Sequence, residues 1–486
     1  MLVLAVPAGS RRFARHVGIA MRVLLACSVF FQLVAVCLAA SVYVHLRIHH
    51  PYHDGSGFPG ILLGPTFVLA WGAILIALVE ISLLRISHPE SRGTGPHQPP
   101  FHLRHIYTGN NPKSRFWVLF GIGCLIVAFD VTTLVNYVDA SGLTSIIGAG
   151  RIGQVHLDTL ASVPGVKPVI ISDVVEPVLK VVTEKYGVPK YTMEGMEVIN
   201  DPDVEAVWIC SPSQFHADQI KASAKAGKHI FCEKPIATDL AGTIEAVQVA
   251  KDCGVKLMTA FQRRFDPSFS RLQAMIEAGE VGTPVSAVLQ SRDPAAPPFD
   301  YVKGGGGLFK DMAIHDLDIA RWLMGSCGTN EPVRVYATGA CNVDKSILEL
   351  KDSNPSEAID TANILIEFES GSTATIQVCR KATYGYDQRV EFFGTDGLVK
   401  HENHFPSAVQ KWTGTSVQQA DLPHAFFMTR YADAYKNETR AFCKILEEGG
   451  DVTPSGEDGL AALKMAMACD KSLKEGRPVN LSEITA

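Results

Sequence analysis

Asp311 and His315 have side-chain types and a spacing that could move a proton. Residues four apart lie on one face of a helix, and the segment GGGGLFKDMAIHDLDIARWLMG shows helical periodicity after its glycines. In that arrangement His315 could take a proton from a hydroxyl group, while Asp311 orients and charges the imidazole. On this segment alone, a capping aspartate and a hydrogen-bonded core histidine are a slightly simpler interpretation, so other residues have to decide between the two.

Lys234 is a third candidate, because it stands at the end of a predicted strand. The segment GKHIFCEKP is apolar up to this lysine, and Pro235 stops the strand directly after it. In open α/β sheets, ligands lie at the carboxyl ends of the strands. Ser211, Ser213 and Arg263 follow two other predicted strands and are expected at the same edge. A lone lysine is usually a solvated surface residue, but this position favours one that faces a ligand.

The segment SIIGAGRIGQVH contains the glycine pattern of a dinucleotide-binding loop. Gly148 permits a tight turn, Gly150 lets the main chain approach a pyrophosphate, and Gly153 lets the helix pack closely on the strand. The pattern follows an apolar strand and opens a helix, and Asp173 ends the next strand, where an acid suits ribose hydroxyls. No arginine stands beside Asp173 to accept the extra phosphate of NADP, so the sequence favours NAD.

The elements that must position these residues change in type along the chain. From residue 143, short apolar strands alternate with helical segments, which predicts a parallel sheet. Further on, TANILIEFESGSTATIQV predicts a hairpin that turns at Ser370-Gly371, and VEFFGTDGLV predicts one that turns at Asp396-Gly397. A dinucleotide-binding part followed by a part rich in hairpins is therefore expected.

Composition excludes several other classes of protein. The chain has 44 Lys and Arg against 50 Asp and Glu, a net charge of -6, which gives no electrostatic footprint for nucleic acid. Its 11 cysteines stand singly, without Cys-x-x-Cys or a metal-ligand spacing, so we expect reduced thiols and no metal site. The histidine-rich segment at 45–54 could bind a metal, but a polar loop explains it better.

Four motifs together, in this order and spacing, resemble the glucose–fructose oxidoreductase / inositol dehydrogenase / rhizopine catabolism (Gfo/Idh/MocA) family. They are GAGRIG, CEKP, RRFDPSF and GGGLFKDMAIHDLD. Two longer segments, SRDPAAPPFDYVKGGGGLFKDMAIHDLDIARWL and YGYDQRVEFFGTDG, are most similar to the inositol 2-dehydrogenase branch of that family. The resemblance covers residues 143–484. It implies an α/β Rossmann domain at 141–265 and an α+β domain with a large, mostly antiparallel sheet at 266–486.

The resemblance also implies roles for individual residues and a homo-oligomer, often a tetramer, formed through the second sheet. Lys234 would be the catalytic lysine, and Asp311 and His315 the acid/base pair. The residues expected around the polyol substrate are Arg263, Asp293, Tyr384 and Tyr386. The residues expected around NAD are Gly148, Gly150, Arg151, Ile152, Gly153, Asp173, Ser211, Ser213, Glu233 and Lys234.

The leading hypothesis is an NAD-dependent inositol 2-dehydrogenase that oxidises a secondary ring hydroxyl. His315 would remove the hydroxyl proton while the hydride leaves the same carbon, and Lys234 would stabilise the negative charge that develops on the oxygen. The alternatives are another sugar or dihydrodiol dehydrogenase of the same family, and a non-catalytic regulator that keeps the NAD-binding fold. The presence of Lys234, Asp311 and His315 together argues against the regulator.

Residues 1–140 lie outside the resemblance and are apolar, poor in acids and flanked by basic residues. The runs 23–44 and 57–79 carry no charge and are each long enough to cross a bilayer as a helix. Asp130 interrupts a third run, 116–138, whose length before this residue also suits a buried helix. The arginines and lysines place the N-terminus and residues 85–115 in the cytoplasm.

The third run decides where the remaining chain lies. If it spans, everything after residue 142 is outside, away from the NAD pool; if it does not, the rest stays cytoplasmic. Three interpretations remain open for residues 1–140. A fusion of two gene models near residues 139–143 is favoured, a membrane-anchored dehydrogenase comes second, and a third run that packs against the enzyme comes last. The catalytic part is expected in the cytoplasm, and the full chain, if genuine, at a membrane.

Overall fold

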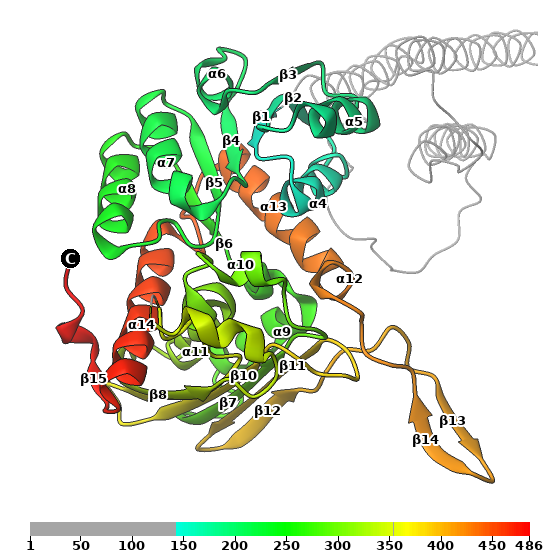
Figure 1. Ribbon diagram of the computed structural model, residues 1–486, viewed down its shortest axis with the longest axis vertical. Helices are drawn as coiled ribbons and strands as arrows, with labels where there is room; N and C mark the ends of the chain where they lie inside the picture. Colours follow the sequence, from blue (N-terminus) through cyan, green and yellow to red (C-terminus); the bar gives the residue numbers. More distant parts are fainter. Residues whose placement is uncertain (1–141, 353) are drawn as a thin grey trace, which may run out of the picture. The chain divides into compact units, whose positions relative to one another are not determined.

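The computed structural model describes residues 142–352 and 354–486 (Figure 1). The candidate membrane spans of residues 1–140 lie outside this part of the chain. Within the described ranges, no helix combines the length and the apolar character needed to cross a bilayer.

The first domain is built on a six-stranded sheet with the order β3-β2-β1-β4-β5-β6. Every neighbouring pair of strands is parallel, which confirms the predicted Rossmann architecture. The strand order reverses between β1 and β4, and this is where ligands of such sheets bind. The elements are β1 (Gly142–Ile147), α4 (Arg151–Leu160), β2 (Val166–Ser172), α5 (Glu176–Tyr186), β3 (Lys190–Thr192), α6 (Gly195–Asn200), β4 (Ala206–Ile209), η1 (Ser213–Phe215), α7 (His216–Lys225), β5 (His229–Glu233), α8 (Leu240–Asp252), β6 (Leu257–Ala260) and η2 (Gln262–Phe265).

Helices cover both faces of this sheet because its central strands are apolar on both sides. All four residues of β4 are buried, as are all four of β6. Two separate apolar clusters result, one centred on Trp208 and Phe231 and the other on Val207 and Ile230. Strands that are buried on both faces are typical of parallel sheets in α/β proteins.

A helix from far down the chain, α13 (Ala432–Glu448), completes the first of these clusters. Phe442 packs its ring against Trp208 and Phe231, at centroid distances of 5.4 and 5.8 Å. The hydroxyl groups of Thr159 on α4 and Thr439 on α13 form a hydrogen bond of 2.8 Å. The predicted boundary at residues 265 and 266 falls between η2 and the following helix, but the core of the first domain is closed by a segment beyond it.

The second domain is built on a mixed seven-stranded sheet with the order β12-β11-β7-β10-β9-β8-β15. Only β7 and β10 pair in parallel, so the sheet is mostly antiparallel, as the resemblance implied. The remaining elements are α9 (Pro267–Glu277), β7 (Pro284–Arg292), α10 (Phe299–Val302), η3 (Phe309–Ala313), α11 (Ile314–Met324), β8 (Pro332–Ala340), η4 (Lys345–Leu350), β9 (Thr361–Phe368), β10 (Thr373–Cys379), β11 (Asp387–Gly394), β12 (Gly397–His401), β13 (Gln410–Thr413), β14 (Ser416–Ala420), α12 (Phe427–Arg430), α14 (Gly456–Glu475), β15 (Val479–Asn480) and η5 (Leu481–Glu483).

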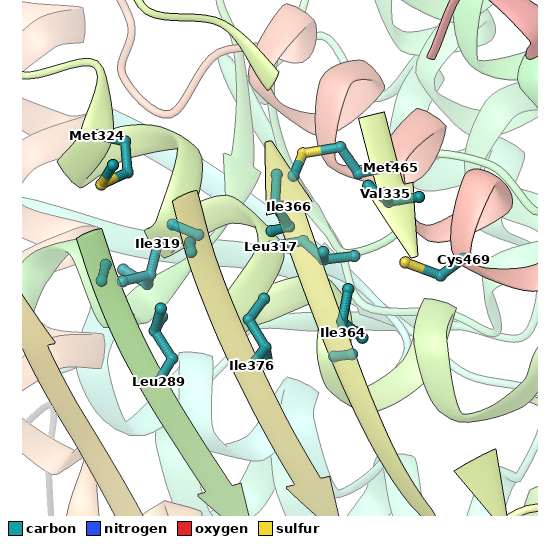
Figure 2. Close-up of a cluster of buried hydrophobic side chains, with 14 of the residues drawn as sticks. Leu289, Leu317, Ile319, Met324, Val335, Ile364, Ile366, Ile376, Met465 and Cys469 are labelled. Atoms are coloured by element: carbon teal, nitrogen blue, oxygen red, sulfur yellow. The ribbon is translucent and has the colours of Figure 1, made fainter. Parts of the chain in front are cut away.

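The helices α11 and α14 cover one face of this sheet and form the core of the domain with it. Figure 2 shows Leu317 and Ile319 of α11 and Met465 of α14 directed at strand side chains such as Ile364 and Ile376. Buried and exposed residues alternate along β9, which is the pattern of a strand with one covered face. The other face of the sheet keeps several exposed apolar side chains.

Both predicted hairpins form, and one turn lies a residue earlier than expected. β9 and β10 pair across the Ser370-Gly371 turn, where Gly371 has a φ of +83°. In the second hairpin, Gly397 already belongs to β12 and pairs with Gly394, so the turn residues are Thr395 and Asp396. The prediction of a turn at Asp396-Gly397 was wrong because it took the glycine as the turn residue, whereas the glycine here is part of the strand.

Candidate active site

The carboxyl edge of the first sheet gathers most of the predicted residues, because consecutive loops leave parallel strands there. The glycine loop follows β1, Asp173 follows β2, and Ser211 follows β4. Glu233 is the last residue of β5, and Lys234 comes directly after it. Arg263 lies in η2, after β6.

The glycine loop has the backbone that the motif requires. Gly148 has a φ of +101°, and a Cβ at this position would lie 2.5 Å from the main-chain oxygen of Cys210. A Cβ at Gly153 would lie 1.9 Å from the main-chain oxygen of Gly148, so only glycine lets α4 start this close to the loop. Around Gly150, in contrast, no atom lies within 4 Å of the Cβ position. The space in front of this glycine, at the N-terminus of α4, is open.

Asp173 is tied to this loop through its side chain. Its Oδ2 accepts a hydrogen bond of 2.7 Å from the main-chain N–H of Ala149, and its Oδ1 accepts one of 2.9 Å from that of Val175. The carboxylate therefore stands beside the glycine loop, where it can also accept hydrogen bonds from ribose hydroxyls.

The other predicted cofactor residues differ in what their side chains do. Arg151 is exposed, and its guanidinium lies 5.8 Å from the ring centre of Phe426. The side chain of Ile152 is partly buried and packs against two apolar clusters. The hydroxyl of Ser211 donates to Gln219 at 2.6 Å, and Ser213 begins η1.

Lys234 meets Asp311 across the two domains. Its ammonium donates to the main-chain oxygen of Asp311 at 2.6 Å and lies 3.3 Å from the carboxylate Oδ1. Both side chains are mostly buried. The sequence placed these two residues in the same site without predicting their contact.

Asp311 is held by two further side chains. Tyr301 donates its hydroxyl to Oδ1 at 3.0 Å, and Arg380 donates to Oδ2 at 2.9 Å. Burial by itself opposes ionisation of this carboxyl, but the charges of Lys234 and Arg380 and the two hydrogen bonds outweigh it and lower the pKa of Asp311 to about 2. Asp311 is therefore a permanent carboxylate at neutral pH.

The expected contact between Asp311 and His315 is not formed. The carboxylate oxygens of Asp311 are occupied by Lys234, Tyr301 and Arg380, and Nδ1 of His315 is buried without a hydrogen-bond partner among the described residues. The helix was expected to be regular through both residues, but Asp311 lies in a π-helical segment, η3, and His315 in the α-helix that follows. The prediction that Asp311 orients the imidazole therefore needs correction.

His315 is a neutral imidazole beside two cations. Burial, together with the charges of Lys234 and Arg263, lowers the pKa of His315 well below its ordinary value. Its ring lies edge-on to Phe261, with the ring centres 6.0 Å apart. A neutral imidazole can accept a proton, which is the state that a general base needs.

Arg263 is fully buried and neutralised by a residue that the sequence did not single out. It donates to Asp316 at 2.8 Å and to the hydroxyl of Ser291 at 3.0 Å. Its charge acts on both His315 and Asp293. Arg263 therefore belongs to the site, although its hydrogen bonds go to the protein.

Asp293 is the second acid of the site. Burial raises the pKa of Asp293 to about 6; Arg380 opposes the shift and Asp311 adds to it. The described residues offer its carboxylate no hydrogen bond, which leaves the oxygens free for hydroxyl groups of a ligand.

The two predicted tyrosines lie in different surroundings. Tyr386 is buried beside Tyr431, and burial raises its pKa well above the ordinary value, with the charges of Arg263 and Asp293 also acting on it. The hydroxyl of Tyr384 donates to Asp387 at 2.5 Å and accepts from Arg292 at 3.1 Å. Tyr386 therefore shares the charged surroundings of the site, whereas Tyr384 is engaged outside it.

Glu233, predicted next to the cofactor, forms a buried pair with His156 of α4, with Oε1 and Nε2 2.8 Å apart.

His216 bridges two loops of the site, because one ring nitrogen lies 2.7 Å from the main-chain oxygen of Ser211 and the other 2.8 Å from that of Pro235. The sequence analysis missed His216, Tyr301, Arg380 and Asp316. Asp316 lies inside one of the quoted motifs and Arg380 lies two residues after a predicted hairpin, but neither pattern indicates the residue with which it pairs.

The chain's own residues fit a dinucleotide. The open space at Gly150, the N-terminus of α4 and the carboxylate of Asp173 provide, respectively, room for a pyrophosphate, a favourable dipole and a ribose acceptor. Three or more metal-ligating side chains do not cluster anywhere in residues 142–352 and 354–486.

Comparison with known proteins agrees with this geometry. Residues 143–261 match the family model "Oxidoreductase family, NAD-binding Rossmann fold", and residues 269–400 match "GFO/IDH/MocA C-terminal domain". The uncharacterized oxidoreductase YrbE of Bacillus subtilis is 43% identical over 339 residues, which cover 70% of this chain and 96% of the relative. Inositol 2-dehydrogenase of Rhizobium meliloti is 41% identical over 337 residues, which cover 69% of this chain and 98% of the relative.

Among solved structures, a putative myo-inositol dehydrogenase from Sinorhizobium meliloti is similar with a TM-score of 0.66 and 39% identity. The match covers 70% of this chain and 100% of that chain. All of these matches leave the N-terminal part of the chain aside.

Proposed function

Since this chain belongs to the Gfo/Idh/MocA family of NAD-dependent oxidoreductases, we propose that it oxidises a secondary ring hydroxyl of a cyclic polyol, with myo-inositol as the substrate that fits best and a keto-inositol as the product. The observation that carries the proposal is the contact between Lys234 and Asp311, with neutral His315 close to the same lysine. A relative named inositol 2-dehydrogenase, matched over nearly its whole length, supports the choice of polyol.

NAD, when bound, supplies the acceptor for the hydride. The residues of the chain bind and orient the substrate and accept its hydroxyl proton. His315 accepts the proton of the reacting hydroxyl at Nε2, because Nδ1 is buried and has no hydrogen-bond partner among the described residues.

Lys234 stabilises the oxygen that is losing its proton. An ammonium has three donors, and Asp311 takes two of them with its main-chain oxygen and Oδ1. The third can be donated to the substrate oxygen. Asp311 stays ionised at neutral pH and holds the ammonium of Lys234 in place, and this ammonium stabilises the developing alkoxide.

Asp293, Tyr386 and Arg263 support recognition of a polyol. Asp293 offers carboxylate oxygens that accept no hydrogen bond from the described residues, and the phenol of Tyr386 interacts electrostatically with it. A site lined by polar groups that need partners binds a ring with many hydroxyls and rejects analogues that lack one of them.

The test is NADH formation by the purified full-length chain with myo-inositol, beside Lys234→Ala and His315→Ala. We expect turnover with NAD, little with NADP, and almost none in either variant. Turnover with a different sugar or a dihydrodiol in place of myo-inositol would keep the enzyme class and replace the substrate. Tight NAD binding without turnover of any polyol would favour a regulator that only keeps the fold.

We also propose that the chain associates with copies of itself through the uncovered face of the second sheet. Tyr336, Leu365 and Val288 are exposed there, and the strand registers place them in one row, with Thr375 between the last two. A row of apolar side chains on a sheet face is a surface that association would bury. Light scattering on the wild type and on Leu365→Asp tests this, and the variant should have the smaller mass.

Residues 1–140 take no part in the proposed chemistry. We propose that the catalytic part works where NAD is available, in the cytoplasm, whether residues 1–140 anchor it to a membrane or belong to another gene. Fractionation of cells, followed by mass spectrometry of peptides from both parts of the chain, distinguishes the two cases.

A further inference from the structure

Tyr301 reaches into the active site from an exposed position. About half of the residue is exposed (51%), yet its hydroxyl donates to Oδ1 of Asp311 at 3.0 Å. It lies on the short helix α10, ten residues before Asp311 in the chain. Neither the motifs nor the proposed chemistry gives this tyrosine a role.

The hydrogen bonds around Asp311 are unequal in length. Arg380 and Tyr301 donate at 2.9 and 3.0 Å, whereas the ammonium of Lys234 stands 3.3 Å from Oδ1. Charge-assisted N–H···O bonds are usually 2.7–2.9 Å long. The carboxylate is thus held firmly by the arginine and the tyrosine, and only loosely by the lysine.

The support of Tyr301 is separate from the main core of the domain. Its neighbour Val302 is buried in a satellite cluster, whose other members come from the segment between β8 and β9. They are Cys341, Ile347 and Leu350, with Phe299 packed against them. α10 is thereby fixed against η4 rather than against the sheet.

Asp360 supports both donors that hold Asp311. Its carboxylate accepts hydrogen bonds from the main-chain N–H groups of residues 342–344, at 2.7–2.8 Å, and so fixes the start of the segment under α10. Its main-chain oxygen accepts from the N–H of Arg380 at 2.8 Å. Tyr301 and Arg380 are therefore positioned from the same residue.

We propose that Tyr301 is a positioning residue for the reaction, whose hydroxyl shares Oδ1 of Asp311 and thereby leaves the ammonium of Lys234 free to hydrogen-bond the substrate oxygen. This inference rests on the proposed function of the same site. Without the hydroxyl, Lys234 is the only partner that the described residues offer to Oδ1, and the ammonium is drawn from the substrate towards the carboxylate.

The test is a double-mutant cycle on the full-length chain, with Tyr301→Phe, Asp311→Asn and both together. Loss of one hydrogen bond to a charged group corresponds to roughly a tenfold change. We expect Tyr301→Phe to lower kcat by about five- to tenfold and to leave the KM for NAD unchanged. In the Asp311→Asn background the same change should cost less than about twofold, because interacting residues are not additive.

The matched control is Tyr191→Phe, which removes an exposed hydroxyl from β3 at the edge of the Rossmann sheet and should leave kcat and both KM values unchanged. Equal losses from Tyr301→Phe in both backgrounds would overturn the proposal. A rise in the KM for the polyol without a fall in kcat would also overturn it, because Tyr301 would then bind the substrate directly. If Asp311→Asn does not fold, Lys234→Met serves as the second background, and there too the effect of Tyr301→Phe should vanish.

A second measurement separates this proposal from the choice of substrate. If myo-inositol is not oxidised, the proposed function fails, but the thermal unfolding midpoints of the same four proteins still report the contact. We expect Tyr301→Phe to lower the midpoint in the wild type and not in Asp311→Asn. Additive midpoints would show that Tyr301 does not act on Asp311, whatever the substrate is.

Discussion

The ammonium of Lys234 lies 2.6 Å from the main-chain oxygen of Asp311, so a residue of the Rossmann domain is held by the second domain through its backbone as well as its carboxylate. A backbone acceptor cannot be removed by substitution of Asp311. The position of the lysine therefore depends on the path of η3 as well as on the charge of the aspartate.

Lys234→Arg should be nearly as inactive as Lys234→Ala. Arginine keeps the charge, but its planar guanidinium cannot donate to two oxygens of Asp311 and to a substrate as a compact ammonium does. We expect kcat to fall at least about a hundredfold, in line with the loss of a group that stabilises an oxyanion. NADH titration by fluorescence is the control, and an affinity for NADH close to that of the wild type would show that the fold survives.

Gly150→Ala and Gly153→Ala should both impair NAD binding, but for different structural reasons. The Cβ at Gly150 enters open space, so that variant should fold with an unchanged melting temperature and a higher KM for NAD, by about tenfold or more. The Cβ at Gly153 meets the main chain of Gly148, so that variant should lose stability as well. Thermal unfolding and NAD kinetics on both variants check this, and an unchanged KM for NAD in Gly150→Ala would contradict the placement of the pyrophosphate.

The KM for the polyol should depend on pH near 6. The pKa of Asp293 is raised to about 6, so its carboxyl is largely protonated below that pH and ionised above it. An ionised carboxylate accepts hydrogen bonds from hydroxyls better than a carboxylic acid does. We therefore expect the KM to rise as the pH falls through 6, and Asp293→Asn to have a high KM that no longer changes there.

The raised pKa of Asp293 also makes the stability of the folded protein depend on pH. The unfolded carboxyl ionises near its ordinary pKa of 3.8, and the folded one near 6, so folding becomes less favourable as the pH rises between these values. Asp293→Asn should therefore be more stable than the wild type above pH 6 and should lose that advantage below about pH 4. Unfolding midpoints at several pH values measure this difference.

Removal of residues 1–140 should leave kcat and both KM values within about twofold of those of the full-length chain. All residues of the candidate site lie in the described part, between Gly148 and Tyr386, and the family models begin at residue 143. NADH formation by the shortened chain and by the full-length chain, purified in the same detergent, compares them directly. A large loss in the shortened chain would mean that the N-terminal part supports the enzyme.

Local motifs made the cofactor site predictable from the sequence. Gly148, Gly150 and Gly153 lie within six residues; the backbone excludes a Cβ at Gly148 and Gly153, and the space at Gly150 is open. Lys234 could be placed because a strand and a proline define where it stands. The parallel sheet followed from the alternation of elements, which depends on local pattern alone.

The contacts within the site were not predictable in this way. Arg380 meets Asp311 across 69 residues of chain, and nothing in its neighbourhood marks that pairing. The spacing of Asp311 and His315 predicted one face of a regular helix, but a π-helical segment changes the direction of the side chains and leaves no clear signal in the sequence. Hydrogen-bond partners across the sheet depend on the packing of whole domains.

The path of α13 has a consequence for the newborn chain on the ribosome. The last strand of the Rossmann sheet ends at Ala260, but the helix that covers Trp208 and Phe231 starts only at Ala432. At the usual rates of translation, the chain between β6 and α13 takes on the order of ten seconds or more to synthesise, and the two rings stay uncovered during that time. During that time a nascent Rossmann domain exposes an aromatic surface that chaperones could bind, so this enzyme should depend on them more than a domain whose core is complete when its last strand emerges.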